Sequence, residues 1–207
     1  MLRKMARETF MYDVYEFFYR LMDNVLEKRT IEIWLKEGEK LPVPHAMKRK
    51  IIKEIIQKNN IQAFVETGTY KGYMVDAVKD LLPKIYSVEI NTFLAHKAIK
   101  RFHKHKNVKI IKGDSSKEIP EIIAKLNNSS FFWLDAHFSG GITGKGEEDS
   151  PLKKELKFIK ENAPSGSIIA IDDIADCNGH NGYPSLDEIL SLSNKHELKN
   201  NIAVLYL

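Results

Sequence analysis

The sequence predicts an α/β fold with a doubly wound, mostly parallel sheet that follows an N-terminal helical extension. From Ile61 onward, short β-type runs alternate with helical patterns, and this alternation is typical of a parallel sheet covered on both faces. Right-handed crossovers between the strands then give the doubly wound arrangement. Every predicted strand also ends in an acidic residue, which places a row of polar side chains where open α/β sheets bind ligands.

Residues 1–60 differ in character and form the expected helical extension, whereas residues 61–207 form the main domain. The stretch ETFMYDVYEFFYRLMDNVLEK repeats apolar residues at spacings of three and four, which indicates an amphipathic, aromatic-rich helix. LPVPHAMKRK interrupts it with two prolines, and a second helix follows over HAMKRKIIKEIIQKNN. We expect the extension to pack on its own domain, to join two copies of the chain as a homo-oligomer or to act as a lid; a membrane surface is the least favoured partner.

The main domain contains five predicted strands, which are AFVE (63–66), KIYSVE (84–89), VKIIKGD (108–114), SFFWLD (130–135) and GSIIAID (166–172). Helical patterns between them cover residues 74–82, 93–105, 116–126 and 152–162. A last helix over residues 185–192 and the terminal run IAVLYL close the chain. No internal repeat and no further domain boundary interrupt this order.

The composition does not indicate a nucleic-acid partner. The net charge of +4 comes from 32 basic and 28 acidic residues, and 43% of the residues are hydrophobic. The stretch KAIKRFHKHKNVKIIK (97–112) is locally basic. We interpret it as the solvated face of a helix and the loop after it, with a phosphate or anionic-glycan contact as the alternative.

Cysteine usage and hydropathy favour a cytoplasmic protein. Cys177 is the only cysteine, so no intrachain disulfide can form and a reducing compartment fits best. No apolar run approaches the ~18 residues needed to cross a bilayer, and the N-terminus lacks the apolar segment of a signal peptide. We therefore expect no stable membrane insertion.

The turn after the first strand, FVETGTYKGYMV, carries two glycines four residues apart. Gly68 would let the backbone approach a ligand, and Gly72 would let the following helix pack closely. The spacing matches neither the G-x-G-x-x-G dinucleotide fingerprint nor the Walker loop. By itself this turn is consistent with a nucleotide-like ligand and equally with an ordinary tight turn.

The next two strand ends favour an adenosine ligand. Glu89 lies about twenty residues beyond the glycine turn, where an acid can accept hydrogen bonds from both ribose hydroxyls. Asp114 in KGDSS could accept from an adenine amino group, with Ser115 nearby. Alternatively, Ser115 and Ser116 cap the following helix, with Glu118 in its first turn.

In this order, VETGTYKG, IYSVEI, IIKGDSS and FFWLDAH resemble the successive motifs of class I S-adenosylmethionine (SAM)-dependent methyltransferases, over residues 64–174. The resemblance implies a Rossmann-like methyltransferase fold with SAM as the cofactor. It places Glu66 and Gly68 by the methionine part, Glu89 at the ribose, and Asp114 with Ser115 at the adenine. The implied cofactor-binding set also contains Thr69, Gly72 and Asp135.

That fold usually has seven strands and ends in an antiparallel hairpin, but only IAVLYL is left here. The sequence therefore leaves open a six-stranded sheet or an altered hairpin. FWLDAHFSGGITGKGEEDSPLKKEL and YPSLDEI further resemble a poorly characterised branch of such proteins, whose acceptors the resemblance does not identify.

Three acids at the ends of the fourth and fifth strands, Asp135, Asp172 and Asp173, are not needed for SAM. Carboxylates brought together repel one another unless a positive charge lies among them, and Mg²⁺ prefers oxygen ligands. The pattern is similar to metal-dependent O-methyltransferases of natural-product and catechol type, which implies these three residues as metal ligands. Alternatively, Asp173 caps a turn and Asp172 accepts a backbone hydrogen bond.

His137 is the expected general base, with Asp135 as the second catalytic residue. In the sugar O-methyltransferases that LDAH resembles, an aspartate at the offset of His137 has the base role. Histidine departs from that pattern, but its ordinary pKa suits proton abstraction. A fourth metal ligand and a plain hydrogen-bonding role are the alternatives.

Together these features predict a SAM-dependent methyltransferase that uses Mg²⁺ to methylate a hydroxyl of a small molecule or saccharide. Two rival functions are a SAM-binding module without catalysis and a nicotinamide-dependent oxidoreductase on a similar fold. The missing G-x-G-x-x-G argues against the oxidoreductase. Acceptor contacts in such folds have no shared sequence code, so the acceptor is not predicted.

Overall fold

The computed structural model of the protein describes residues 25–135, 151–180 and 182–207, together with the single positions 11, 14, 18, 21 and 22. The chain divides into two compact units, Met1–Lys50 and Ile51–Leu207, and the division falls within helix α2 (His45–Lys58). Across the described residues, no helix is long and apolar enough to cross a membrane.

The second unit contains a seven-stranded sheet with the strand order β3-β2-β1-β4-β5-β7-β6. Strands β1 to β5 run parallel, whereas β7 is antiparallel to both β5 and β6. The strand bounds are β1 Ala63–Thr67, β2 Lys84–Glu89, β3 Val108–Lys112, β4 Ser130–Leu134, β5 Ile168–Ile171, β6 Lys195–Lys199 and β7 Ile202–Tyr206. The predicted doubly wound, mostly parallel sheet is confirmed.

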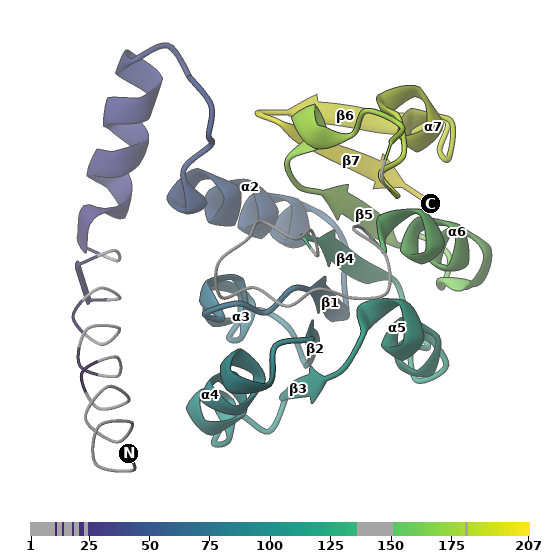
Figure 1. Ribbon diagram of the computed structural model, residues 1–207, viewed down its shortest axis with the longest axis horizontal. Helices are drawn as coiled ribbons and strands as arrows, with labels where there is room; N and C mark the ends of the chain where they lie inside the picture. The colour runs from purple at the N-terminus through teal and green to yellow at the C-terminus, as the bar shows by residue number, and fades with distance from the viewer. Residues whose placement is uncertain are drawn as a thin grey trace. The chain divides into compact units, whose positions relative to one another are not determined.

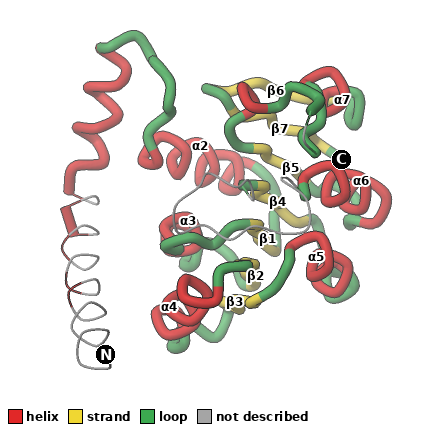
Figure 2. Tube along the Cα trace, viewed as in Figure 1, coloured by secondary structure: helices red, strands yellow, loops and turns green. Residues whose placement is uncertain are grey.

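Helices cover both faces of the sheet, because parallel strands that follow one another in the chain are joined by helical crossovers (Figure 1). Helices α3 (Tyr73–Val78) and α4 (Thr92–Phe102) lie on one side of the strands, and α5 (Ser115–Ile123) and α6 (Leu152–Asn162) lie on the other. Figure 2 shows the strands as the middle layer between these helices. A short 3₁₀ turn (Ile174–Asp176) and helix α7 (Leu186–Leu190) follow β5.

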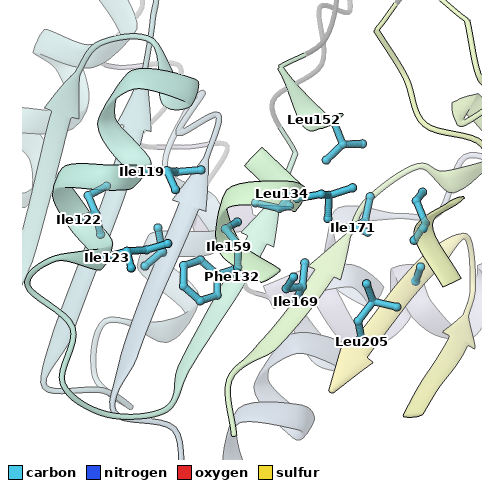
Figure 3. Close-up of a cluster of buried hydrophobic side chains, with 14 of the residues drawn as sticks. Ile119, Ile122, Ile123, Phe132, Leu134, Leu152, Ile159, Ile169, Ile171 and Leu205 are labelled. Carbon is cyan, nitrogen blue, oxygen red and sulfur yellow. The ribbon is translucent and has the colours of Figure 1, made fainter. Parts of the chain in front are cut away.

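A hydrophobic core lies between the sheet and the α5–α6 layer. Figure 3 shows Phe132 and Leu134 of β4 together with Ile169 and Ile171 of β5 among the isoleucines of α5 and α6. Alternate residues on a strand point to opposite faces of the sheet. Phe64 of β1 and Phe131 of β4 are opposite each other and point to the same face, where their rings stack with centres 5.9 Å apart. Burial on both faces explains why β1, β4 and β5 are almost continuous apolar runs.

The antiparallel hairpin that the sequence left open is present. Strand β6, KHELK, pairs with β7 along its length, from Lys195 opposite Tyr206 to Lys199 opposite Ile202. Its side chains are mostly exposed because it forms the edge of the sheet, and a charged edge strand lacks the apolar pattern of the other strands. Asn200 and Asn201 adopt positive φ angles and make the tight turn between β6 and β7.

In the first unit, residues 25–36 are helical, so the amphipathic helix continues beyond the predicted end of its apolar pattern. Several large apolar side chains among the described residues of the first unit are exposed, among them Phe18 and Val25. The expected roles of the extension, as a lid, a packing element or a homo-oligomer contact, stay predictions.

Candidate functional site

The carboxyl ends of the parallel strands bring the predicted acidic residues to one edge of the sheet. Backbone hydrogen bonding continues just past the strand ends, since the N–H of Asp135 donates to the carbonyl of Thr67 at 3.3 Å. The N–H of Asp172 donates in the same way to the carbonyl of Leu134 at 3.1 Å. The ends of β1, β4 and β5 are therefore held side by side, and the polar residues that follow them share one edge.

The glycine turn between β1 and α3 is anchored to the neighbouring strand. The N–H groups of Gly68 and Thr69 both donate to the carbonyl of Val88, at 2.9 and 3.1 Å. Gly72 has a φ of 73°, and a Cβ atom there would lie 2.7 Å from a ring carbon of the buried Phe102. The close packing expected of Gly72 is confirmed, because a larger residue would strain the backbone and displace that ring.

Glu89, the last residue of β2, is 5% exposed and holds the glycine turn from the side. Its Oε2 accepts from the N–H of Tyr70 at 2.7 Å, and its Oε1 accepts from the N–H of Asn91 at 2.8 Å. A carboxylate has about four lone-pair sites, so each oxygen can still accept one further hydrogen bond. The residue is thus fixed in place and can accept from two further donors, such as a vicinal diol.

Glu66 is buried inside the edge rather than open at its surface. Its Oε2 accepts a 2.5 Å hydrogen bond from Ser87, whose hydroxyl lies 2.6 Å from that of Thr69. Burial raises the pKa of Glu66 to about 8; the hydrogen bond from Ser87 opposes this shift, and the charge of Glu89 adds to it. Glu66 is therefore a neutral acid at pH 7.

Asp114 caps helix α5. Its Oδ1 accepts from the N–H of Ser116 at 3.0 Å and lies 2.8 Å from the hydroxyl of the same residue. The alternative in which the serines cap the helix is wrong, because Ser115 and Ser116 already lie in the first turn and the aspartate supplies the cap. Glu118 lies in the first turn as predicted.

Asp135, Asp172 and Asp173 form a cluster in which one carboxylate oxygen of each lies within 4.8 Å of those of the other two. Asp172 is buried, and its Oδ1 accepts from the N–H of Asp173 at 3.0 Å. Asp172 thus accepts a backbone hydrogen bond, as the alternative to metal binding expected, and it also belongs to the acidic cluster.

Asn201 holds Asp173 of the acidic cluster in place. Its side-chain amide donates to Oδ1 of Asp173 at 3.0 Å, and its own Oδ1 accepts from the N–H of Ala175 at 2.8 Å. Asp173 has a φ of 48°, a left-handed conformation that is uncommon for residues other than glycine. The β6–β7 turn therefore holds Asp173 in a conformation that turns the chain directly after β5.

Glu155 on α6 is a further buried acid near the same edge. It is 1% exposed, and within the part of the chain that the structure describes neither of its carboxylate oxygens has a hydrogen-bond partner; the same holds for the buried hydroxyl of Thr67. Burial raises the pKa of Glu155 to about 7, and Asp114 adds to the rise. The hydroxyls of Ser115 and Thr67 oppose it, although neither completes a hydrogen bond of ordinary geometry with the acid. Glu155 therefore loses its proton at a higher pH than an ordinary glutamate does.

The predicted base, His137, lies outside the described residues, as does the glycine-rich loop that follows it. The other predicted site residues, which are Glu66, Gly68, Thr69, Gly72, Glu89, Asp114, Ser115, Asp135, Asp172 and Asp173, all lie at or just beyond the carboxyl ends of β1 to β5.

No family model matches the chain, and no curated protein does. Among solved structures, it is similar to the O-methyltransferase TomG from Streptomyces achromogenes in complex with SAM, at 13% identity and a TM-score of 0.58 over 87% of this chain and 86% of TomG. It is also similar to an O-methyltransferase from Bacillus cereus in complex with S-adenosylhomocysteine (SAH), at 13% identity and a TM-score of 0.56 over 91% and 96% of the two chains.

A third similar structure is a precorrin-6y C5,15-methyltransferase from Geobacter metallireducens, at 13% identity and a TM-score of 0.53 over 77% of each chain. The chain has the class I SAM-dependent methyltransferase fold. The seven strands and the antiparallel hairpin after β5 agree with this fold, which the sequence alone did not settle.

Within the methyltransferase fold, several residues at the edge escaped sequence reasoning. The sequence indicates only that Ser87 and Thr67 belong to strands and that Glu155 belongs to a charged helix. Asn201 lies in a turn 28 residues from its partner Asp173. For Asn201 the usable sequence signal is the pair Asn200-Asn201, because asparagine tolerates positive φ. This signal indicates a turn but does not identify Asp173 as the partner.

Proposed function

We propose that the chain is a SAM-dependent methyltransferase that transfers a methyl group to a hydroxyl of a small molecule or saccharide, with a divalent cation such as Mg²⁺ at the acidic cluster. The observation that carries this proposal is the position of the cluster. Asp135 is bonded through its backbone to Thr67, directly before the glycine turn. A cofactor held at the turn and a metal held at the cluster would therefore be neighbours.

The cofactor would be held by residues of three strand ends. Glu89 keeps one acceptor position on each oxygen, which suits the two ribose hydroxyls. Gly68, Thr69, Gly72 and Glu66 would face the methionine part, whereas Asp114 and Ser115 would face the adenine. Asp135 would lie next to the reactive end of the cofactor, since it belongs to both the β4 end and the acidic cluster.

The cluster suits a hard divalent cation. Three carboxylates from adjacent strand ends offer oxygen ligands within 4.8 Å of one another, and such a group of charges is stabilised by a cation. Asp173 is oriented by Asn201 and Asp172 by a backbone N–H, an outer layer of hydrogen bonds that is typical of metal ligands. A bound Mg²⁺ would lower the pKa of an acceptor hydroxyl and fix its direction.

The reaction is an in-line displacement in which the acceptor oxygen bonds to the methyl carbon as the sulfur–methyl bond breaks, leaving SAH. The chain's part is to align the two reactants, because positioning supplies much of the rate in such transfers. The acceptor also loses a proton, and we assign it to His137, two residues beyond Asp135.

The similar structures support methyl transfer through the fold they share with this chain and through the SAM or SAH that two of them contain. Two of the three are named as O-methyltransferases. We take this naming as support for a hydroxyl acceptor in the proposed reaction.

Turnover tests this proposal. The full chain is incubated with SAM and a panel of catechols, flavonoids and sugars, and SAH formation is followed with Mg²⁺ and with excess chelator. We expect SAH formation with at least one hydroxylated acceptor, lost on chelation. Turnover that survives excess chelator would contradict the metal assignment, and SAH binding without turnover on any acceptor would favour a non-catalytic SAM-binding module.

A further inference from the structure

Arg101 does not take part in the solvated face that we expected for the basic stretch 97–112. It lies in the last turn of α4, and its side chain is only 16% exposed, whereas the preceding Lys100 is exposed. The two residues carry the same charge on the same helix and point into different surroundings. The inward direction of Arg101 requires partners that lie outside α4.

Those partners belong to the glycine turn and to the helix that follows it. Nη1 of Arg101 donates a 2.5 Å hydrogen bond to the carbonyl of Lys71, and Nη2 lies 2.9 Å from a carboxylate oxygen of Asp76. The guanidinium also lies over the rings of Phe102 and Tyr73, at 4.9 and 5.9 Å from their centres. One planar group thus makes polar and cation–π contacts with α3, α4 and the turn.

The turn needs such contacts because of its backbone conformation. Tyr70 has a φ of 48°, which is rare for an aromatic residue and costs conformational energy. Its N–H is fixed by Glu89, and one residue later the carbonyl of Lys71 is fixed by Arg101. Neighbouring backbone groups of the turn are therefore held by a carboxylate on one side and a guanidinium on the other.

We propose that Arg101 is a positioning residue for cofactor binding, which holds the Gly68–Gly72 turn in its binding conformation through the carbonyl of Lys71. This inference rests on the proposed function, because it takes the turn to be the cofactor site. A turn that is already in the bound conformation binds without paying for ordering, and a loosened turn binds more weakly. Arg101 itself does not contact the cofactor in this account.

A guanidinium suits this task better than an ammonium. Its planar fork can donate to the Lys71 carbonyl and to Asp76 at the same time while its central carbon lies over the Phe102 ring. Lysine offers a point charge without that plane. Arg101→Lys should therefore restore only part of what Arg101→Met removes, although it keeps the charge.

The test measures SAH binding to the full chain by calorimetry for the wild type, Arg101→Met, Arg101→Lys and the matched control Lys100→Met. Both methionine variants remove one positive charge from the same helix. We expect Arg101→Met to weaken SAH binding by roughly tenfold or more, the size of one lost charge-assisted hydrogen bond. Lys100→Met should change the affinity by less than about twofold, as expected for an exposed charge, and Arg101→Lys should fall in between.

Hydrogen exchange supplies a readout that a purely structural role would not produce. In Arg101→Met the amides of residues 68–72 should exchange faster than in the wild type, whereas those of β4 and β5 should be unchanged. If Arg101→Met lowers the melting temperature while SAH affinity and turn exchange stay as in the wild type, the inference is wrong. If that variant does not fold, equal affinities of Arg101→Lys and the wild type, with unchanged turn exchange, also overturn it.

The same data separate this inference from the proposed function. A wild-type chain that binds no SAH contradicts the proposed function and the cofactor role given to Arg101. A wild-type chain that binds SAH, together with an Arg101→Met variant of equal affinity, contradicts the inference alone.

Discussion

The N–H of Tyr70 donates a 2.7 Å hydrogen bond to the carboxylate of Glu89, which ties the glycine turn after β1 to the end of β2. The other oxygen of Glu89 accepts from Asn91 at the start of α4. One carboxylate therefore connects the turn, the second strand and the following helix. Removing it should disturb both the shape of the turn and any ligand that the acid holds.

Glu89→Ala is expected to weaken SAH binding by about a hundredfold or more, since hydrogen bonds to charged groups contribute about 1.5–3 kcal/mol each and about 1.4 kcal/mol is tenfold. Calorimetry with SAH measures the effect. Glu121→Ala, which removes a largely exposed acid on α5, is the control and should leave the affinity unchanged. Equal affinity of Glu89→Ala and the wild type would remove Glu89 from the cofactor site.

Changing both Asp172 and Asp173 to Asn should abolish binding of Mg²⁺ or Mn²⁺ while SAH binding stays within about threefold, because the carboxylates of the cluster are the hard ligands such cations require. Electron paramagnetic resonance of Mn²⁺ reports the metal directly. Asp187→Asn, an exposed acid of α7, is the control. Retention of Mn²⁺ by the double variant would contradict the metal site.

The stability of the protein should fall as the pH rises through neutrality, partly because of Glu66. In the unfolded chain this group loses its proton near its ordinary pKa of 4.5, whereas the folded chain keeps it up to a pKa of about 8. Between these values unfolding releases a proton, so Glu66 lowers the free energy of unfolding by about 1.4 kcal/mol per pH unit. Its contribution is complete below pH 4.5 and lost by pH 8.

Glu66→Gln removes this dependence, since the amide resembles the protonated acid and can still accept from Ser87. Chemical denaturation from pH 5 to pH 9 should give a flatter stability curve for the variant, which is the more stable of the two at the alkaline end. The same pH slope in both proteins would show that Glu66 does not retain its proton in the fold.

Glu155→Leu should stabilise the protein at pH 8, because it removes a buried acid whose carboxylate has no hydrogen-bond partner among the described residues. The raised pKa of about 7 means that the folded chain holds a desolvated charge above neutrality. We expect a gain of about 1–3 kcal/mol at pH 8 and a smaller one at pH 5, where the acid is neutral. Glu161→Leu on the exposed side of α6 is the control, and a loss of stability in Glu155→Leu at pH 8 would show that the acid has a partner.

Gly72→Ala and Gly166→Ala separate backbone strain from steric overlap. Both glycines have a positive φ, 73° and 76°, but an added Cβ meets Phe102 at 2.7 Å in the first case and nothing closer than 3.7 Å in the second. We expect a loss of about 1–2 kcal/mol for Gly166→Ala and about 2–4 kcal/mol for Gly72→Ala. Equal melting temperatures of the two variants would mean that the Phe102 ring gives way without cost.

Much of this fold could be predicted because local patterns and sheet topology agree. All five parallel strands and the helices between them follow from alternating apolar runs, with α6 and β2 at their predicted bounds. Strand β6 was missed because its residues are mostly charged and it is held by pairing with β7 alone. Edge strands of this kind carry little sequence signal.

The candidate site was predictable as far as strand ends place residues at one edge. The three acids of the cluster were correctly expected to meet, because adjacent parallel strands end at the same level. The contacts that fix the acidic cluster and the glycine turn were not predicted, since Asn201 reaches Asp173 from a distant turn and Arg101 reaches Lys71 from a distant helix. Whether Asp114 or the following serines cap α5 depends on a one-residue difference in where the helix begins, and local sequence patterns do not resolve such a difference.

We expect the carboxyl edge of β1 to β3 to bind SAM rather than a nicotinamide dinucleotide, and calorimetric titration of the full chain with SAH and with NAD tests this assignment. We predict saturable one-to-one binding of SAH, its loss in Glu89→Ala, and no binding of NAD at the same concentrations, with or without Mg²⁺. Binding of NAD in place of SAH, or SAH binding that is unaffected by Glu89→Ala, would contradict the account.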